Sequence, residues 1–128
     1  MFRRLFVIGA VSVLAACGGG GGDDVNLSGL WTGTSTGTIN GVAATGSGRW
    51  TLAQSGSRVT GVSIGDNGLS STIEATFDGR TLTGISTPSN PNNCSGQFVL
   101  TYSNNTLTGQ SVTINCSAYI SANVVMRR

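Results

Sequence analysis

The stretch STIEATFDGRTLTGIS, residues 71–86, decides the fold, because it predicts a β-hairpin and its pattern recurs along the chain. Apolar and polar residues alternate on both sides of its centre, which is typical of strands with one buried face. At the centre, Asp78-Gly79 is a strong hairpin signal, since both central residues of a type I′ turn need a positive φ angle.

A glycine lies in the middle of the second predicted strand, where it contributes no side chain to the packing. With Asp78-Gly79 as the turn, Ala75 is expected to face Leu82, and Ile73 to face Gly84. The side chain of Ile73 would then fill the space that the glycine leaves, as in sheets that must curve.

The same pattern recurs in two further segments, RWTLAQSGSRVTGVS and QFVLTYSNNTLTGQS. Their turns are predicted at Ser55-Gly56 and at Asn104-Asn105. The resulting pairs are Trp50–Gly61, Leu52–Val59, Leu100–Gly109 and Tyr102–Leu107. All three predicted turns place a large apolar residue opposite a glycine. Such agreement indicates one shared strand register and is less readily explained by coincidence in a glycine-rich chain.

This register sorts the side chains onto two faces. The apolar face carries Trp50, Leu52, Ile73, Ala75, Phe77, Leu82, Phe98, Leu100, Tyr102 and Leu107 together with the glycines. The polar face carries Thr51, Thr60, Thr72, Glu74, Thr76, Thr83, Thr101 and Thr108, with a few Val and Ile. Apolar residues inside and threonines outside describe a water-soluble sheet, whereas a transmembrane barrel needs the reverse.

A first strand at about 29–39, turning at Asn40-Gly41, and a last strand at about 117–127 bring the expected count to eight. All are joined to their sequence neighbours, and such a meander closes into an up-and-down barrel that has no edges. The predicted fold is therefore an all-β, eight-stranded antiparallel barrel. Eight strands enclose an interior that side chains just fill, or that holds one small ligand.

The segment Gly29-Leu30-Trp31 resembles the G-x-W signature at the start of the first strand in lipocalins and related calycins. Avidin-like barrels have the same strand count. The lipocalin resemblance implies that Trp31 lies at the closed end of the barrel, under an arginine near the end of the last strand. Arg128 is expected to point inward, because it is an even number of residues from the inward-facing Ile120 and Val124. A cation–π contact between Arg128 and Trp31 would contribute about 0.5–2 kcal/mol.

The chain begins with Arg3-Arg4 and then an apolar run that is shorter than the roughly 20 residues of a membrane span. The following Leu14-Ala15-Ala16-Cys17 resembles the bacterial lipobox. The resemblance implies cleavage before Cys17, a diacylglycerol on its sulfur, and an acyl chain such as palmitate on its amino group. An ordinary secretory signal with an incidental cysteine is the alternative.

These observations divide the chain into a signal peptide (1–16), a lipidated cysteine with a flexible glycine-rich linker (17–26) and a barrel domain (27–128). The expected location is the cell envelope, anchored to the membrane by lipid. In lipoproteins of Gram-negative bacteria, Asp directly after the lipidated cysteine tends to retain the protein in the inner membrane. Gly18 stands at that position here, so the resemblance favours the outer membrane, with the domain in the periplasm or at the surface.

The composition argues against several functions. The chain has no His and no Lys, and the acids and arginines beyond the signal balance, so nucleic-acid binding is not expected. Cys94 and Cys116 are expected to form a disulfide and not a metal site. A serine nucleophile would need Asp66, Glu74 or Asp78 as its base, but Glu74 is expected to point outward and both aspartates lie in predicted turns, so we expect no enzyme. We also expect no cofactor and a monomer.

The predicted topology places the tight turns and both termini at one end, and longer connections at the other, at about 40–46, 65–68, 87–95 and 112–117. A small pocket for an apolar or amphipathic ligand is the functional hypothesis at this distal mouth, lined by Trp50, Phe98, Ser35, Ser63, Ser86 and Ser111. Three alternatives remain open: a filled core, a protein-interaction or hydrolase-inhibitor lipoprotein that uses the loop 86–95, and a structural lipoprotein without ligand.

Overall fold

A computed structural model describes residues 25–114 and 116–128 of the chain. The predicted signal peptide, Cys17 and most of the predicted linker lie outside the described residues. Within the described residues, the chain forms eight strands and no helix, so no helix is long and apolar enough to cross a membrane.

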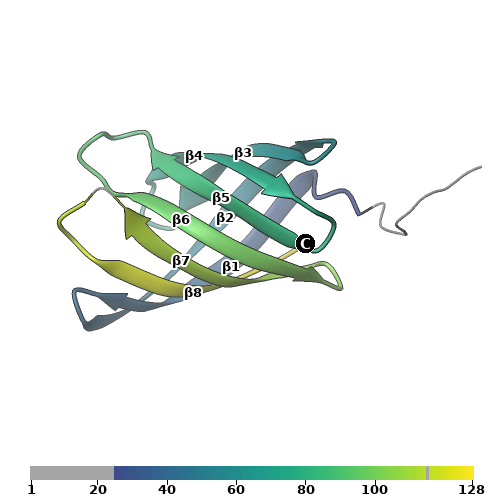
Figure 1. The fold of residues 1–128 in the computed structure, drawn as a ribbon. Coiled ribbons are helices and arrows are strands. Elements are labelled where there is room, and N and C mark those ends of the chain that lie inside the picture. The colour runs from purple at the N-terminus through teal and green to yellow at the C-terminus, as the bar shows by residue number, and fades with distance from the viewer. Residues whose placement is uncertain (1–24, 115) are drawn as a thin grey trace, which may run out of the picture.

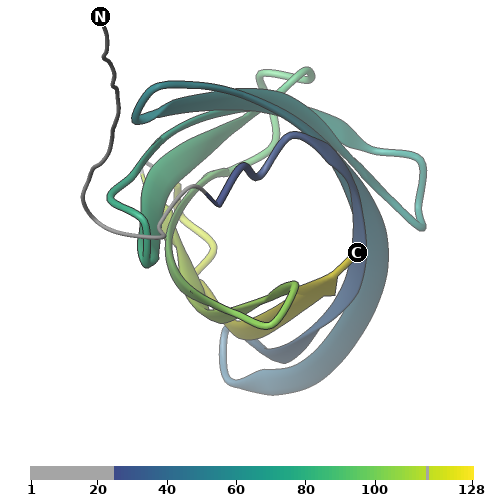
Figure 2. The ribbon, with the colours of Figure 1, turned by 90° about the vertical axis from the view of Figure 1, so that its right-hand side faces the viewer.

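The strands form one closed antiparallel barrel in chain order, and β1 pairs with β8 to close it. Figure 1 shows the strands from the side, and Figure 2 shows the ring that they form along the axis. Their bounds are β1 (Gly29–Ile39), β2 (Val42–Ser55), β3 (Arg58–Gly65), β4 (Ser70–Phe77), β5 (Thr81–Pro88), β6 (Ser95–Ser103), β7 (Thr106–Ile114) and β8 (Ile120–Arg127). The predicted eight-stranded up-and-down barrel is confirmed.

The barrel core contains the residues that the alternation assigned to the inside. The buried hydrophobic residues are Leu27, Trp31, Leu52, Val59, Ile73, Ala75, Phe77, Leu82, Phe98, Leu100, Leu107, Val124 and Met126. Trp50 and Tyr102 are partly buried and pack against this core. The predicted outward threonines are exposed, except for the half-buried Thr60.

Leu27 is a core residue that strand alternation did not identify, because it precedes the first strand. Its side chain is fully buried, and its N–H donates to the Gln54 side-chain oxygen at 2.8 Å. The segment before β1 therefore folds back across the end of the barrel and helps to close it.

Two of the predicted turns have the expected geometry. Asn104 and Asn105 have φ angles of 51° and 59°, and Leu100 faces Gly109 as predicted. Asn40 and Gly41 also have positive φ angles, but the longer connection expected at 40–46 is absent. β2 begins at Val42 because pairing with β1 continues up to the turn.

The predicted pairing between β2 and β3 is wrong by two residues. Leu52 faces Gly61 and Trp50 faces Ser63, because the turn is formed by Gly56 and the residue after it. Gly56 has a φ angle of 61°. A type II′ turn requires such a glycine at its first central position, and this requirement moves the turn by one residue.

The predicted pairing between β4 and β5 is wrong by the same two residues. Phe77 faces Leu82, Ala75 faces Gly84 and Ile73 faces Ser86. The residues 78–80 connect the two strands, and the Asp78 carboxylate accepts the N–H groups of Thr81 at 2.6 Å and Arg80 at 2.9 Å.

These two donors, that of Thr81 first, hold the pKa of the Asp78 carboxyl below its ordinary value of 3.8. The Arg80 N–H therefore donates to the Asp78 side chain, whereas in a two-residue turn it would donate to a backbone carbonyl oxygen. Since both pairing errors are of two residues, every side chain stays on its predicted face.

The mid-strand glycines allow strands to approach closely. A Cβ atom at Gly109 would contact the Val99 carbonyl oxygen and lie 2.9 Å from the Leu100 Cα atom. A Cβ atom at Gly84 would contact the Ala75 Cβ atom and lie 2.5 Å from the Glu74 carbonyl oxygen. These obstacles lie across the strand pair, so the glycines bend the sheet as barrel closure requires.

The two ends of the barrel differ as predicted. The turns after β2, β4 and β6 lie at the same end as the C-terminus and the segment that leads into β1 (Figure 1). The connections 66–69, 89–94 and 116–119 lie at the other end, which we call the open end. The loop predicted at 86–95 is shorter than expected, because β5 extends to Pro88, and β8 begins at Ile120 rather than at 117.

Candidate ligand pocket at the open end

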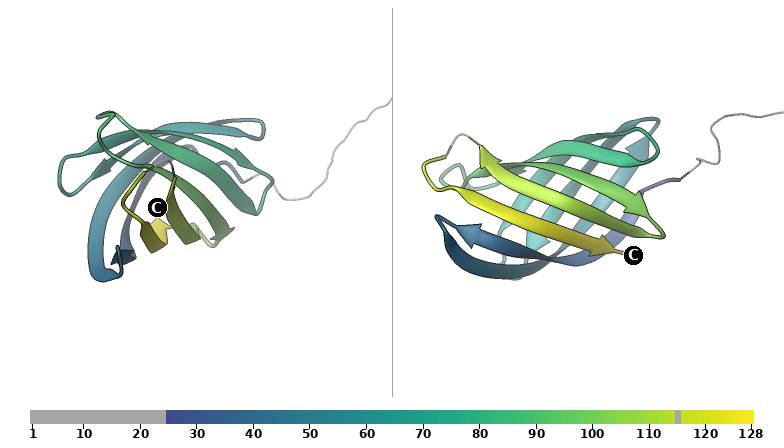
Figure 3. Two further views of the ribbon diagram at one scale, coloured as in Figure 1. Left: turned by 60° about the vertical axis from the view of Figure 1, so that its left-hand side comes forward. Right: turned by 60° about the horizontal axis from the view of Figure 1, so that its bottom comes forward.

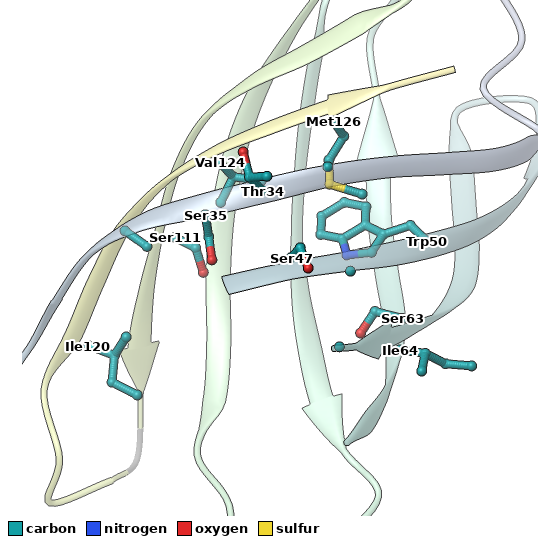
Figure 4. A pocket seen from close by; sticks show the side chains of 14 residues that line it. Thr34, Ser35, Ser47, Trp50, Ser63, Ile64, Ser111, Ile120, Val124 and Met126 are labelled. Atoms are coloured by element: carbon teal, nitrogen blue, oxygen red, sulfur yellow. The ribbon is translucent and has the colours of Figure 1, made fainter. Parts of the chain in front are cut away.

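A cavity of about 270 Å³ occupies the open half of the barrel (Figure 4). Side chains and backbone from β1, β2, β3, β7 and β8 surround it. Its lining residues are Gly33, Thr34, Ser35, Ser47, Gly48, Trp50, Ser63, Ile64, Gly65, Ser111, Ile120, Ala122, Val124 and Met126.

Trp50 forms the aromatic floor of this cavity. Its ring lies 5.1 Å from the ring of Phe98, measured between centroids, with the two planes at 51°. Phe98 is 2% exposed and does not line the cavity. Of these two aromatic residues predicted for the pocket, Trp50 lines the cavity, whereas Phe98 packs behind it in the core.

Three of the four predicted serines, Ser35, Ser63 and Ser111, line the cavity. Ser86 is not part of the lining. It lies beside Gly96, where an added Cβ atom would be 3.1 Å from the Ser86 hydroxyl and 3.4 Å from that of Ser111. Hydroxyls from alternate strands thus face the inside of the open half.

These hydroxyls are available to a ligand. Serine side chains do hydrogen-bond elsewhere in the barrel, for instance Ser47 to Asp66 and Ser70 to Ser89. Within residues 25–114 and 116–128, no side-chain hydrogen bond involves any of the four predicted pocket serines. A hydroxyl without a protein partner can bind water or the polar group of a ligand.

Three glycines in the cavity lining form one row across β1, β2 and β3. Gly33 pairs with Gly48, and Gly48 pairs with Gly65, so one row across three strands has no side chain. The cavity also takes in Val124 and Met126 of β8. The glycine row could be found only from the β1–β2–β3 register, because these three residues are far apart in the sequence.

The lining contains no Arg, Asp or Glu among the residues that the structure describes. An ionised ligand would therefore lose its hydration without gaining a countercharge, which is costly. The cavity thus favours an uncharged molecule, with its apolar part against Trp50 and its polar groups near the serine hydroxyls.

The predicted disulfide lies at the rim of the open end. Cys94 and Cys116 are joined, with their Cα atoms 5.4 Å apart. Ser95, which follows Cys94, pairs with Ile114 as the outermost pair of β6 and β7. The bond therefore continues this strand pair at the rim and connects the loops before β6 and after β7.

The closed end contains the contact that the G-x-W resemblance implied. The guanidinium carbon of Arg128 lies 4.7 Å from the centroid of the Trp31 ring. The indole N–H of Trp31 donates to the Leu27 carbonyl oxygen at 2.9 Å, and Arg128 donates to the Asn26 carbonyl oxygen at 2.7 Å. Trp31 thus ties the segment before β1 to the C-terminus, opposite the cavity.

The described part of the chain has no cluster of three or more His, Cys, Asp or Glu residues that could hold a metal ion. No family model and no curated protein matches the chain.

Solved structures with a similar fold include "a redesigned beta barrel, mFAP1, bound to DFHBI", at 21% identity and a TM-score of 0.60. A second is "EF1p2_mFAP2b bound to DFHBI", at 17% identity and a TM-score of 0.58. Each comparison covers 80% of this chain and 94% of the other. At these identities the likeness extends to the barrel fold alone.

Proposed function

We propose that this protein is a lipid-anchored envelope lipoprotein whose barrel binds a small, uncharged, apolar or amphipathic molecule at its open end. The observation that carries the binding function is the cavity of about 270 Å³ with Trp50 at its floor and serine hydroxyls on its walls. An apolar floor with a few polar groups around it is the usual composition of a ligand pocket.

The size of the cavity limits the ligand. Pockets for drug-sized molecules occupy about 300–1,000 Å³, so this cavity suits a single ring system or a short acyl chain. The two similar barrels are each bound to a small molecule, DFHBI. This supports the idea that a barrel of this architecture can enclose such a ligand.

The lipid anchor follows from Cys17 and the residues before it. The first described residues enter the barrel at its closed end, close to Trp31 and Arg128. A tether through residues 18–24 would therefore hold the closed end toward the membrane. The cavity would then open away from the membrane, where it can receive a ligand from the aqueous phase.

Native mass spectrometry of the protein purified from its own cells tests the pocket. We expect a retained small-molecule mass that Ser63→Phe abolishes, because Ser63 lines the cavity and a phenyl ring would fill it. Val62→Phe is the matched control, since Val62 is 45% exposed on the outside of the same strand. A barrel that is always empty, or one that keeps its ligand in Ser63→Phe, would contradict the binding proposal.

Replacement of the lipidated cysteine tests the anchor separately. We expect Cys17→Ala to accumulate as an uncleaved precursor without lipid, because the sulfur that receives the diacylglycerol is absent. Intact mass and partition into detergent measure this. If Cys17→Ala still fractionates as a mature lipoprotein, the anchor assignment is wrong, while the pocket is unaffected.

A further inference from the structure

The β1–β2 hairpin reaches past the end of β3 and leaves one edge of β2 without a partner strand. β2 pairs with β1 along its whole open-end half, from Val42 onward. Its pairing with β3 stops at Gly48, which faces Gly65. Figure 3 shows the hairpin in blue at the open end.

The hydrogen bonds of Ser47 show which backbone groups of β2 point to this edge. The Ser47 carbonyl oxygen accepts the Asp66 N–H at 2.8 Å, and the Ser47 N–H donates to the Asp66 carboxylate at 3.3 Å. Ser47 thus directs both of its backbone groups away from β1. In an antiparallel pair every second residue does the same, so Thr45 and Ala43 present their N–H and C=O groups at the free edge.

The free edge, residues 42–46, has none of the usual protection against pairing. Natural edge strands are protected by charged side chains, proline, bulges or a covering segment. The sequence VAATG contains no charge and no proline, and Val42 is 70% exposed. No described residue pairs with Ala43 or Thr45 on this side.

A second cavity, of about 130 Å³, lies on the inner face of the hairpin. Ala44 and Gly46 contribute small residues to its lining, and Ile39, Ile120 and Ala122 make it largely apolar. A strand added at the free edge would direct every second side chain to this inner face. One apolar side chain could therefore enter the cavity while its backbone pairs with Ala43 and Thr45.

The size of the free edge argues for a short peptide as the occupant. Pairing is limited to five residues, 42–46, by the turn at Asn40-Gly41 and by the hydrogen bonds between Ser47 and Asp66. A contact of this length is much smaller than the roughly 800 Å² per partner that a stable dimer buries. Strand addition by an extended peptide needs only backbone hydrogen bonds and a side-chain pocket.

We propose that the free edge of β2 binds a short extended peptide segment of a partner protein by strand addition, with one apolar side chain of the peptide in the cavity beside Ala44 and Gly46. This interaction is separate from the ligand pocket and does not depend on it. The unpaired backbone groups provide the affinity, and the cavity selects an uncharged apolar residue.

Amide hydrogen exchange by NMR on the purified protein tests the proposal, with the capped peptide Ser-Thr-Leu-Thr-Ser as the probe. Without peptide, the amides of Ala43 and Thr45 should exchange fast, whereas those of Ala44 and Gly46, which face β1, should be protected. Adding the peptide should slow exchange at Ala43 and Thr45. The same peptide with aspartate in place of leucine should bind at least about tenfold more weakly, since a charge would be buried in the cavity.

A substitution at the edge provides a second test. Thr45→Pro removes one donor from the free edge and should weaken binding by about tenfold. Thr45→Val is the matched control and should bind normally, because it keeps the N–H group. Equal binding of the two peptides, or protection of amides elsewhere, would overturn the proposal even if Thr45→Pro did not fold. Concentration-dependent protection of Ala43 and Thr45 without peptide would assign the edge to a second copy and overturn it as well.

Discussion

Replacing Trp31 with alanine should destabilise the barrel by about 3–5 kcal/mol, because it removes a fully buried indole from the closed end. The indole also packs edge-on against Tyr102, with ring centroids 6.4 Å apart, and holds the Leu27 carbonyl oxygen through its N–H. Thermal unfolding should shift down by more than about 10 °C, since 1 kcal/mol corresponds to several degrees in a domain of this size.

Two variants divide this effect between the ring and its polar contact. Trp31→Phe keeps an aromatic ring but loses the hydrogen bond to Leu27, and should cost about 1–3 kcal/mol as the buried carbonyl oxygen loses its donor. Arg128→Ala removes the cation over the ring, a contact worth about 0.5–2 kcal/mol. A melting temperature of Trp31→Ala within a few degrees of the parent would show that this residue does not close the barrel.

Replacing Gly84 with valine should destabilise the barrel by about 3 kcal/mol, at the upper end of what overpacking usually costs. The added Cβ atom would contact the Ala75 Cβ atom and approach the Glu74 carbonyl oxygen to 2.5 Å. Since one of these obstacles is backbone, β4 and β5 must move apart. Chemical denaturation of the parent and the variant measures the loss.

A second substitution shows which residue opposes Gly84. The structure places Ala75 there, so Ala75→Gly should recover part of the stability that Gly84→Val loses. Ile73→Ala should recover none, because Ile73 faces Ser86 in this pair. Rescue by Ile73→Ala alone would support the pairing predicted from a two-residue turn and contradict the structure.

The candidate site could be predicted only in part. Trp50, Ser35, Ser63 and Ser111 were found because inward parity and strand polarity place them in the open half. Phe98 and Ser86 have the same parity but do not line the cavity. The odd or even position of a residue along its strand determines the face of the sheet on which its side chain lies. Contact with a cavity depends in addition on how far each strand extends and on which neighbouring residues are small.

The sequence by itself determined the strand count, the antiparallel meander, the face of each strand residue and the end at which the chain enters and leaves the barrel. These properties depend on local periodicity and turn residues, which act between near neighbours. The tertiary structure alone decided the exact pairing of two hairpins, the burial of Leu27, the glycine row behind the cavity and the free edge of β2. Each of these depends on competing turn geometries or on the closure of the barrel, which brings together residues that no local pattern relates.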